Sequence, residues 1–437
     1  MLAITKLNRF SLTMIVISLV IGMGIFRAAS VSAQAALTPG IFFGAWIFGG
    51  LIALCGALTY AEIGARFQAT GGYYKLFSYA YHPSIAFALN CAVLISNAAA
   101  LGGVAIIGSE YISEVIFKEG ASPLQKTSIA ILAIITFYTV NLAGLSMSSK
   151  VQNVLMFIKI GMLAVIISGL FVVDSSSNEW TLPTMPFNFW SYLSSFGSAL
   201  IAVCFTYGGY QQSINFGEEV HDAPRTIPKG IITGILIVLA LYLLANYSYY
   251  KVIGFQELKE ANGIAALVAE KIFGPIGKTL FSILLFIAVL AFVNVQLLSN
   301  PRVMYAMADD GILPKAFQNR NTKNGVLTVA LSAFTLLTIV ILFFAKTFDN
   351  ILGFAMFLES IGMATSAYSL FILRKKTQHL DNTNIYRMKG VPWQTILFIM
   401  SYLFITLIII IKTPLMALTG CLVFLGILLL YFIFRKL

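Results

Sequence analysis

Long apolar segments, separated by short polar ones, recur along the whole sequence. Twelve of these segments approach or exceed the roughly 20 residues that a helix needs to cross a bilayer. Outer-membrane β-barrels show short alternating segments instead. The predicted spans are residues 11–30, 39–63, 84–110, 127–147, 151–173, 192–216, 228–250, 277–306, 326–345, 350–373, 392–412 and 414–434. The pattern therefore predicts an all-α polytopic membrane protein with twelve transmembrane helices.

Glycines interrupt the middle of the first and the sixth predicted spans. The first contains Gly22 and Gly24, and the sixth contains the pair Gly208-Gly209. Each glycine weakens a helix by about 1 kcal/mol relative to alanine, and lipid cannot bind the peptide groups that an unwound turn exposes. One interpretation is that these glycines only allow close packing between helices. Because two spans share the feature, we favour helices that unwind around a polar cavity.

The two interrupted spans are five spans apart, so they cross the membrane in opposite directions. This spacing is typical of two inverted five-helix repeats, with a binding site at the interruptions near the middle of the bilayer. We expect one transmembrane domain over residues 1–437, with the repeats at residues 11–173 and 192–373. Residues 392–434 would supply two additional helices outside the repeats.

Composition and charge support a membrane protein and argue against a partner nucleic acid. Of the 437 residues, 59% are hydrophobic and only 10% are charged, against roughly 25% charged residues in soluble domains. The net charge is +11, but 18 of the 28 Lys and Arg residues fall on the side of the two termini. That bias predicts cytoplasmic termini in a multi-pass protein of the cell (inner or plasma) membrane.

Two further features bear on alternative classes of protein. The four cysteines all lie inside apolar segments, which is typical of buried thiols rather than of a disulfide framework or a zinc site. We therefore expect no metal and no cofactor. Lys6 and Arg9, ahead of an apolar run, imitate a cleavable signal peptide. We expect the run to be retained, because cleavage would remove the first glycine interruption.

Four motifs also resemble those of a known transporter family and follow one another in the family's order. They are Gly22-Met23-Gly24-Ile25-Phe26; Gly56 to Phe67 with Gly71-Gly72-Tyr73; Phe205-Thr206-Tyr207-Gly208-Gly209 with Glu218-Glu219 and Arg225-Thr226-Ile227-Pro228; and Arg302 to Pro314. The family is the amino acid–polyamine–organocation (APC) superfamily, particularly the bacterial relatives of the L-type amino acid transporters. The resemblance covers roughly residues 8–375. It implies the five-plus-five inverted-repeat, LeuT-like fold and the transport of amino acids or close derivatives.

The predicted substrate site is the pair of interruptions, because a free amino acid carries one anionic and one cationic group. Exposed N–H groups at the start of a helix favour an anion, and carbonyl groups at the end of a helix accept from an ammonium. We expect the substrate carboxylate at the N–H groups of Gly22, Met23, Gly24 and Ile25. We expect the ammonium at the carbonyl groups of Leu19, Val20, Phe205, Thr206 and Gly208. This division matches the one that the resemblance implies.

Four side chains near the interruptions leave alternatives open. Met23 replaces the family's usual Ser or Thr, which removes a hydroxyl and leaves the preferred substrate size undetermined. Phe205 corresponds to the family's aromatic gate over the substrate, or it is a core aromatic. Tyr210 lines the side-chain pocket, where relatives often carry Trp, or it too belongs to the core. Asn97 resembles a pocket-lining Asn of the arginine/agmatine branch, or it makes an interhelical hydrogen bond.

Lys159 is an intramembrane cation, about 12 Å along the fifth predicted span at about 1.5 Å per residue. A lysine there costs about 2.5–3.5 kcal/mol on insertion scales, so a functional role is expected. The resemblance places such a lysine in the space of a sodium ion, where its ammonium ties the unwound first helix to the eighth. Residues 291–293 offer no hydroxyl there, which leaves Asn294 and Gln296 as candidate partners. The alternatives are a lysine that reaches the lipid headgroups and one that carries protons.

Other charged side chains leave several roles open. Glu359, in the tenth predicted span, pairs with a cation, stays protonated as a neutral acid, or takes part in proton coupling. On the cytoplasmic side, an inner gate and ordinary solvation are both compatible with the pattern of charges. The residues concerned are Glu62, Arg66, Glu218, Glu219 and Arg225.

Together these features predict a sodium-independent amino acid transporter that works by alternating access, most simply as an exchanger (antiporter). The main alternative is a proton-coupled symporter in which Lys159 or Glu359 titrates. A channel and a non-transporting amino acid sensor are weaker alternatives, and no nucleophile–base pair or metal-ligand cluster indicates an enzyme. The expected partners are an amino acid and membrane lipid. Residues 110–126 contain no Cys, so we expect no covalently bound protein partner.

Overall fold

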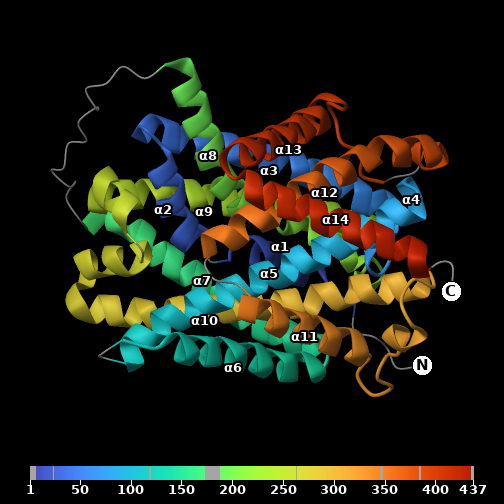
Figure 1. The fold of residues 1–437 in the computed structure, drawn as a ribbon, viewed down its shortest axis with the longest axis horizontal. Coiled ribbons are helices and arrows are strands. Elements are labelled where there is room, and N and C mark those ends of the chain that lie inside the picture. The colour runs from blue at the N-terminus through green and yellow to red at the C-terminus, as the bar shows by residue number, and fades with distance from the viewer. Residues whose placement is uncertain are drawn as a thin grey trace.

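The computed structural model describes residues 6–22, 24–117, 120–172, 188–261, 263–344, 348–382 and 385–434, and these form a bundle of helices (Figure 1). The α-helices are α1 (Arg9–Val20), α2 (Gly24–Ala35), α3 (Pro39–Arg66), α4 (Gly72–Ala80), α5 (Pro83–Ile116), α6 (Pro123–Leu142), α7 (Leu145–Val172), α8 (Phe189–Tyr207), α9 (Ala223–Glu260), α10 (Ile264–Asp309), α11 (Thr328–Phe344), α12 (Phe348–Lys376), α13 (Trp393–Lys412) and α14 (Pro414–Phe434). The 3₁₀ helices are η1 (Tyr210–Asn215), η2 (Gly217–Glu219), η3 (Lys315–Gln318) and η4 (Gln378–Asn382).

The helices agree with the predicted spans in type and in order. Within the described ranges, 11 helical segments are long and apolar enough to cross a membrane, and the first of them joins α1 and α2. α11, which corresponds to predicted span 326–345, is apolar but shorter. The prediction of an all-helical, multi-span membrane protein is therefore confirmed.

Glycines with positive φ explain where the helix boundaries differ from the prediction. The fourth span was expected to continue to residue 147, but α6 ends at Leu142, and Gly144 (φ 108) starts the chain toward α7. α9 ends later than its predicted span, and α10 begins earlier than its predicted span. Each contains a non-helical glycine, Gly254 (φ 79) in α9 and Gly274 (φ 72) in α10, so a short helical piece continues past a kink. Such φ values are readily available only to glycine.

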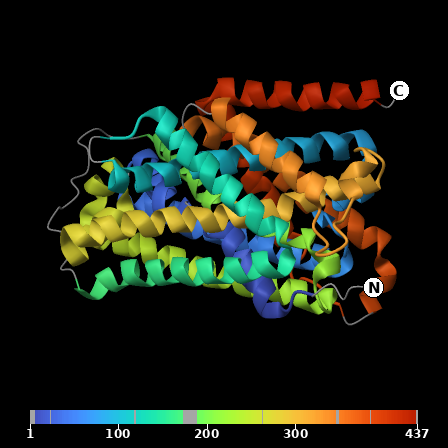
Figure 2. The ribbon, with the colours of Figure 1, turned by 90° about the horizontal axis from the view of Figure 1, so that it is seen from below.

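The packing brings the first span to the middle of the molecule. In the most apolar stretch of the first span 88% of the residues are buried, against 11% for α14. Figure 2 shows α14 as a separate rod along one edge of the bundle. α2 packs against α8, α3 against α9, and α5 against α10.

Candidate functional site

The first span is broken at the predicted glycines. α1 ends at Val20 and α2 begins at Gly24, while Met23 lies outside the described residues. Ile21 has non-helical dihedral angles (φ −72, ψ 81), and the Gly22 N–H donates to the Val20 carbonyl at 2.7 Å. Gly22 therefore does not offer the free N–H that was expected of it. A helix leaves N–H groups unpaired at its start and carbonyl groups at its end, so the gap presents both kinds of group.

The second interruption lies directly against the first. α8 ends at Tyr207, and Gly208 and Gly209 lead into η1. Gly209 has φ 107, and a Cβ atom there would also clash with the Leu19 carbonyl oxygen. A Cβ atom on Gly24 would lie 2.7 Å from Thr206 Oγ1. Glycines are therefore required where the two broken spans touch.

Tyr242 joins the carbonyl groups of the two broken spans. This fully buried tyrosine of α9 donates its hydroxyl to the Val20 carbonyl at 3.0 Å and reaches the Thr206 carbonyl at 3.4 Å. Both carbonyls are among the predicted ammonium acceptors. Tyr242 was not predicted, and nothing in its apolar surroundings in the sequence distinguishes it from a core tyrosine.

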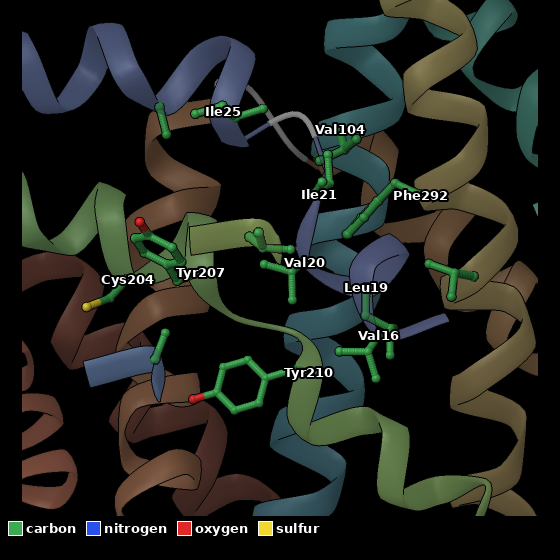
Figure 3. Close-up of a cluster of buried hydrophobic side chains, with 14 of the residues drawn as sticks. Val16, Leu19, Val20, Ile21, Ile25, Val104, Cys204, Tyr207, Tyr210 and Phe292 are labelled. Atoms are coloured by element: carbon green, nitrogen blue, oxygen red, sulfur yellow. The ribbon is translucent and has the colours of Figure 1, made fainter. Parts of the chain in front are cut away.

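A small cavity of about 40 Å³ lies between the interruptions. Figure 3 shows Leu19 and Val20 at the end of α1, with Val104 and Phe292 close to Ile21. The cavity brings together most of the predicted site: its wall includes Leu19, Val20, Gly22, Gly24, Asn97, Phe205, Thr206, Gly208 and Glu359. Ile25 is fully buried and is not part of the wall. The arrangement gives one enclosed space with a helix start, helix ends and a carboxylate around it.

Amide side chains form a part of the cavity wall that was not predicted. Gln212 follows the second interruption, and its Nε2 donates to Asn97 Oδ1 at 3.4 Å. Asn97 in turn donates to Asn300 Oδ1 at 2.7 Å, which makes the interhelical hydrogen bond that was one of its two interpretations. Gln212 Oε1 is buried without a partner in the described part of the chain. The signal in the sequence is the polar pair Gln211-Gln212 directly after two glycines in an apolar span.

Tyr210 does not line the cavity, which favours the second of its two interpretations, a core aromatic. Its ring is fully buried and lies 5.9 Å from the Tyr60 ring, centroid to centroid. In Figure 3 the ring points away from Phe292, and its hydroxyl contacts Gly56 of α3. The physical reason is the turn at Gly209, whose positive φ directs the next residue toward α3 instead of the cavity.

Lys159 reaches the first interruption from α7. Its side chain is fully buried, and Nζ donates to the Ile21 carbonyl at 2.5 Å. The alternative of a lysine that extends to the headgroups is therefore excluded. Of its two candidate partners, Asn294 and Gln296, neither bonds to it among the described residues. Asn294 bonds instead to Gln152 Oε1 at 2.6 Å, nearer the start of α7, while Gln296 lines the cavity.

Glu359 projects from α12 into the cavity wall. Its Oε1 accepts from Gln211 Nε2 at 3.1 Å, and Gln211 Oε1 accepts from the Gly209 N–H at 2.9 Å. No Lys, Arg or His side chain forms an ion pair with it in the ranges that the structure describes. Of its three open roles, pairing with a protein cation therefore has no support among these residues.

The sequence matches the amino acid permease family over residues 7–433. The chain belongs to this family. Permeases of this kind are transporters, so this protein is an amino acid transporter and not an enzyme. The serine/threonine exchanger SteT of Bacillus subtilis is 27% identical over 91% of this chain and 89% of its own length. The human cystine/glutamate transporter is 26% identical over 83% and 72%, and the mouse large neutral amino acids transporter small subunit 2 is 25% identical over 83% and 69%.

Buried ion pairs lie in the permease at the positions predicted to be cytoplasmic. Glu62 accepts from Arg66 Nε at 2.7 Å and from Arg374 Nη2 at 2.7 Å, and Glu219 accepts from Arg302 Nη2 at 2.6 Å. Arg302 and Arg374 were not among the expected gate residues, because their partners are far away in the sequence.

Two expected members of this ion-pair group lie apart from it. Glu218 accepts from the Thr70 hydroxyl at 2.6 Å. Arg225 is exposed and approaches its neighbour Asp222 at 3.9 Å. Both are therefore closer to the ordinary solvated charges that were the alternative interpretation.

A larger pocket of about 790 Å³ lies outside the central cavity of the permease. Its charged wall residues are Arg27, Glu110, Glu114, Lys126 and Lys278. Glu114 and Lys126 come from the segment between the third and fourth predicted spans.

Proposed function

We propose that this permease is a sodium-independent amino acid exchanger that works by alternating access. The observation that carries the proposal is the contact between Lys159 Nζ and the Ile21 carbonyl at the broken first span. In transporters with discontinuous helices, unwound carbonyl groups coordinate the driving cation. Here the ammonium of Lys159, which is part of the chain itself, donates to such a carbonyl. The ammonium has no other hydrogen-bond acceptor among the described residues. A separate sodium ion is therefore unnecessary.

The substrate's charged groups bind at the ends of the broken helices. The first turn of α2, at Gly24 and Ile25, supplies N–H donors and the positive end of the helix dipole for the carboxylate. Carbonyl groups of Leu19, Phe205 and Gly208 border the same cavity and accept from the ammonium. The cavity has room for only a few water molecules, so a substrate must widen it. The half-buried Phe205 is the side chain that moves, as an aromatic gate.

The fold that supports this mechanism is the LeuT-like inverted repeat, with residues 11–173 and 192–373 as the two halves and residues 392–434 outside them. The packing of α2 on α8, α3 on α9 and α5 on α10 supports it. Each of these is a pair of helices at equivalent positions in the two halves, as a two-fold axis between inverted repeats requires. The termini are placed in the cytoplasm on the basis of loop charge.

Exchange, rather than one-way transport, follows from the immobile charge. A driving ion leaves a symporter with its substrate, whereas the ammonium of Lys159 stays at the first interruption in every state. The empty carrier then reorients slowly, and only a second substrate releases it. The similarity to SteT, a serine/threonine exchanger at 27% identity, supports the same conclusion.

Proton-coupled symport is the second candidate, and Glu359 favours it. A carboxylate in the cavity wall without a cation partner among the described residues can bind a proton together with the substrate. Lys159 would be the other group able to titrate. This candidate predicts uptake driven by a pH gradient.

Proteoliposomes containing the purified permease separate these candidates. A thermal-shift screen against the common amino acids selects a ligand, because a ligand that binds only the folded form stabilises it. With sodium replaced by choline and equal pH on both sides, we expect labelled substrate to exchange at least tenfold faster than it leaves into substrate-free buffer. Efflux as fast as exchange, or a strict sodium requirement, would refute the exchanger. Uptake driven by an imposed pH gradient would support symport.

A further inference from the structure

We propose that Glu359 pairs with a cationic side chain of the substrate, so that this permease selects basic amino acids. The inference rests on the proposed transport function and adds a substrate class to it. Glu359 is then the specificity-determining residue of the cavity. Gln211 is the residue that positions it.

The first step is that no protein cation balances this carboxylate among the residues that the structure describes. Two other largely buried glutamates bind arginines: Glu62 binds two and Glu219 binds one. Within the described ranges, the side chain of Glu359 has only the amide of Gln211 as a hydrogen-bond partner. Among the described residues, the charge of Glu359 acts on three phenols and one thiol, none of which becomes a cation: Tyr73, Tyr210, Tyr402 and Cys204. A charge in such surroundings needs a partner, because burying it alone is costly.

The second step is the position of this carboxylate at the carbonyl end of α8. A Cβ atom on Gly208 would lie 3.3 Å from Glu359 Oε1 and 3.4 Å from the carbonyl oxygens of Cys204 and Phe205. The last carbonyl groups of a helix carry a partial negative charge. The carboxylate adds a full negative charge at the same place, and Phe205, Gly208 and Glu359 border the cavity.

The third step is the hydrogen-bond relay that fixes Gln211. The Gly209 N–H donates to Gln211 Oε1 at 2.9 Å, which requires the amide oxygen to face the main chain. The amide NH₂ group therefore faces Glu359, and Nε2 donates to Oε1 at 3.1 Å. The second interruption thus holds the carboxylate in place as an acceptor at the cavity.

The charges of a substrate then decide which class fits. The α-carboxylate and the α-ammonium of any amino acid balance each other, and the ends of the broken helices provide for both. The carboxylate of Glu359 is an additional negative charge, which neither of these two substrate groups balances. The guanidinium of arginine or the ammonium of lysine or ornithine neutralises it, whereas a neutral side chain leaves it unpaired or requires a proton.

The test compares L-arginine with L-citrulline, which has almost the same shape but no side-chain charge. Isothermal titration of the full-length permease in nanodiscs is expected to give at least tenfold tighter binding of arginine. In Glu359→Gln, an almost isosteric change, the ratio of the two affinities should fall to near one. The control is Glu270→Gln in α10, which removes one negative charge from an exposed ion pair with Lys278 (3.3 Å). It should keep the full ratio.

Several outcomes would overturn the inference. One is citrulline binding to the unchanged permease as tightly as arginine does; another is an unchanged ratio in Glu359→Gln. Proton uptake on citrulline binding that disappears in Glu359→Gln would make this residue a proton carrier instead. Should the variant fail to fold, the unchanged permease still decides the matter with ornithine against norvaline, for which the same tenfold preference is expected.

Counterflow in proteoliposomes separates a failure of this inference from a failure of the proposed function. Exchange of neutral but not basic amino acids would contradict the role of Glu359 and leave the exchanger intact. If no amino acid of either class is exchanged, the transport mechanism itself is wrong.

Discussion

Replacing Lys159 by Met should slow exchange strongly while changing the stability of the permease by much less than the loss of a buried ion pair would. Methionine keeps a long, unbranched side chain in the same space and removes only the ammonium. The Ile21 carbonyl at the first interruption then loses its donor at 2.5 Å. Because the contact joins α7 to the broken first span, its loss is expected to free the segment that must be held for substrate to bind.

Two opposing terms set the magnitude for this variant. A hydrogen bond from a charged donor contributes about 1.5–3 kcal/mol, and that contribution is lost. A lysine near the centre of a membrane helix costs about 2.5–3.5 kcal/mol, and that cost disappears. The net change in unfolding free energy therefore stays within about 2 kcal/mol. If this bond stabilises the state that binds substrate and no other folded state, its loss of about 1.5–3 kcal/mol lowers exchange by about 10- to 100-fold. The conversion is a factor of ten for about 1.4 kcal/mol.

Thermal unfolding in nanodiscs and counterflow in proteoliposomes measure the two effects of this change. Lys251→Met is the matched control, because Lys251 Nζ also donates to a helix carbonyl, that of Leu170 at 2.6 Å, but it does not border the cavity. We expect the control to exchange normally. Full exchange by Lys159→Met, or an equal loss in both variants, would refute the reasoning.

Four other substitutions test separate parts of the site. Gly209→Ala forces a side chain onto a backbone with φ 107; it should destabilise the fold by about 1–3 kcal/mol, and an unchanged melting temperature would contradict this. Tyr242→Phe removes a bond of about 1 kcal/mol between the two interruptions, so substrate affinity measured by titration should fall several-fold. Glu219→Gln leaves Arg302 buried without its partner and should lower stability by about 3–5 kcal/mol, whereas replacing both by Met should restore most of it. Tyr210→Phe should leave affinity unchanged, and a loss would return this residue to the pocket.

The features that the sequence predicts correctly depend on local chemistry. Apolar length locates the spans, and glycine locates the interruptions, because an unwound turn needs no information from other helices. The place of Lys159 was also predictable in outline. A buried ammonium must find carbonyl oxygens, and the interruptions are where a helix exposes them.

The alternatives that the sequence left open concern direction around a helix axis and partners far away in the sequence. Asn294 lies on the predicted helix but bonds to Gln152 near the start of α7, and Tyr210 turns toward α3 after Gly209. Tyr242 could not be predicted as a bridge, because its two acceptors come from two other spans. These positions depend on how the helices pack, and hydropathy does not contain that information.

The site could therefore be predicted to the level of its main chain, but not to the level of its side-chain pocket. Gln211 and Glu359 lie 148 positions apart in the sequence, and only the fold brings them together. The proposed substrate class rests on that contact rather than on any motif.

A structure of the permease with its bound amino acid tests the central claim most directly. The account predicts density in the cavity between the interruptions, with the carboxylate at the N–H groups of Gly24 and Ile25 and the ammonium facing the carbonyl ends of α1 and α8. Density confined to the larger pocket beside Arg27, with the two interruptions still in contact, would contradict it.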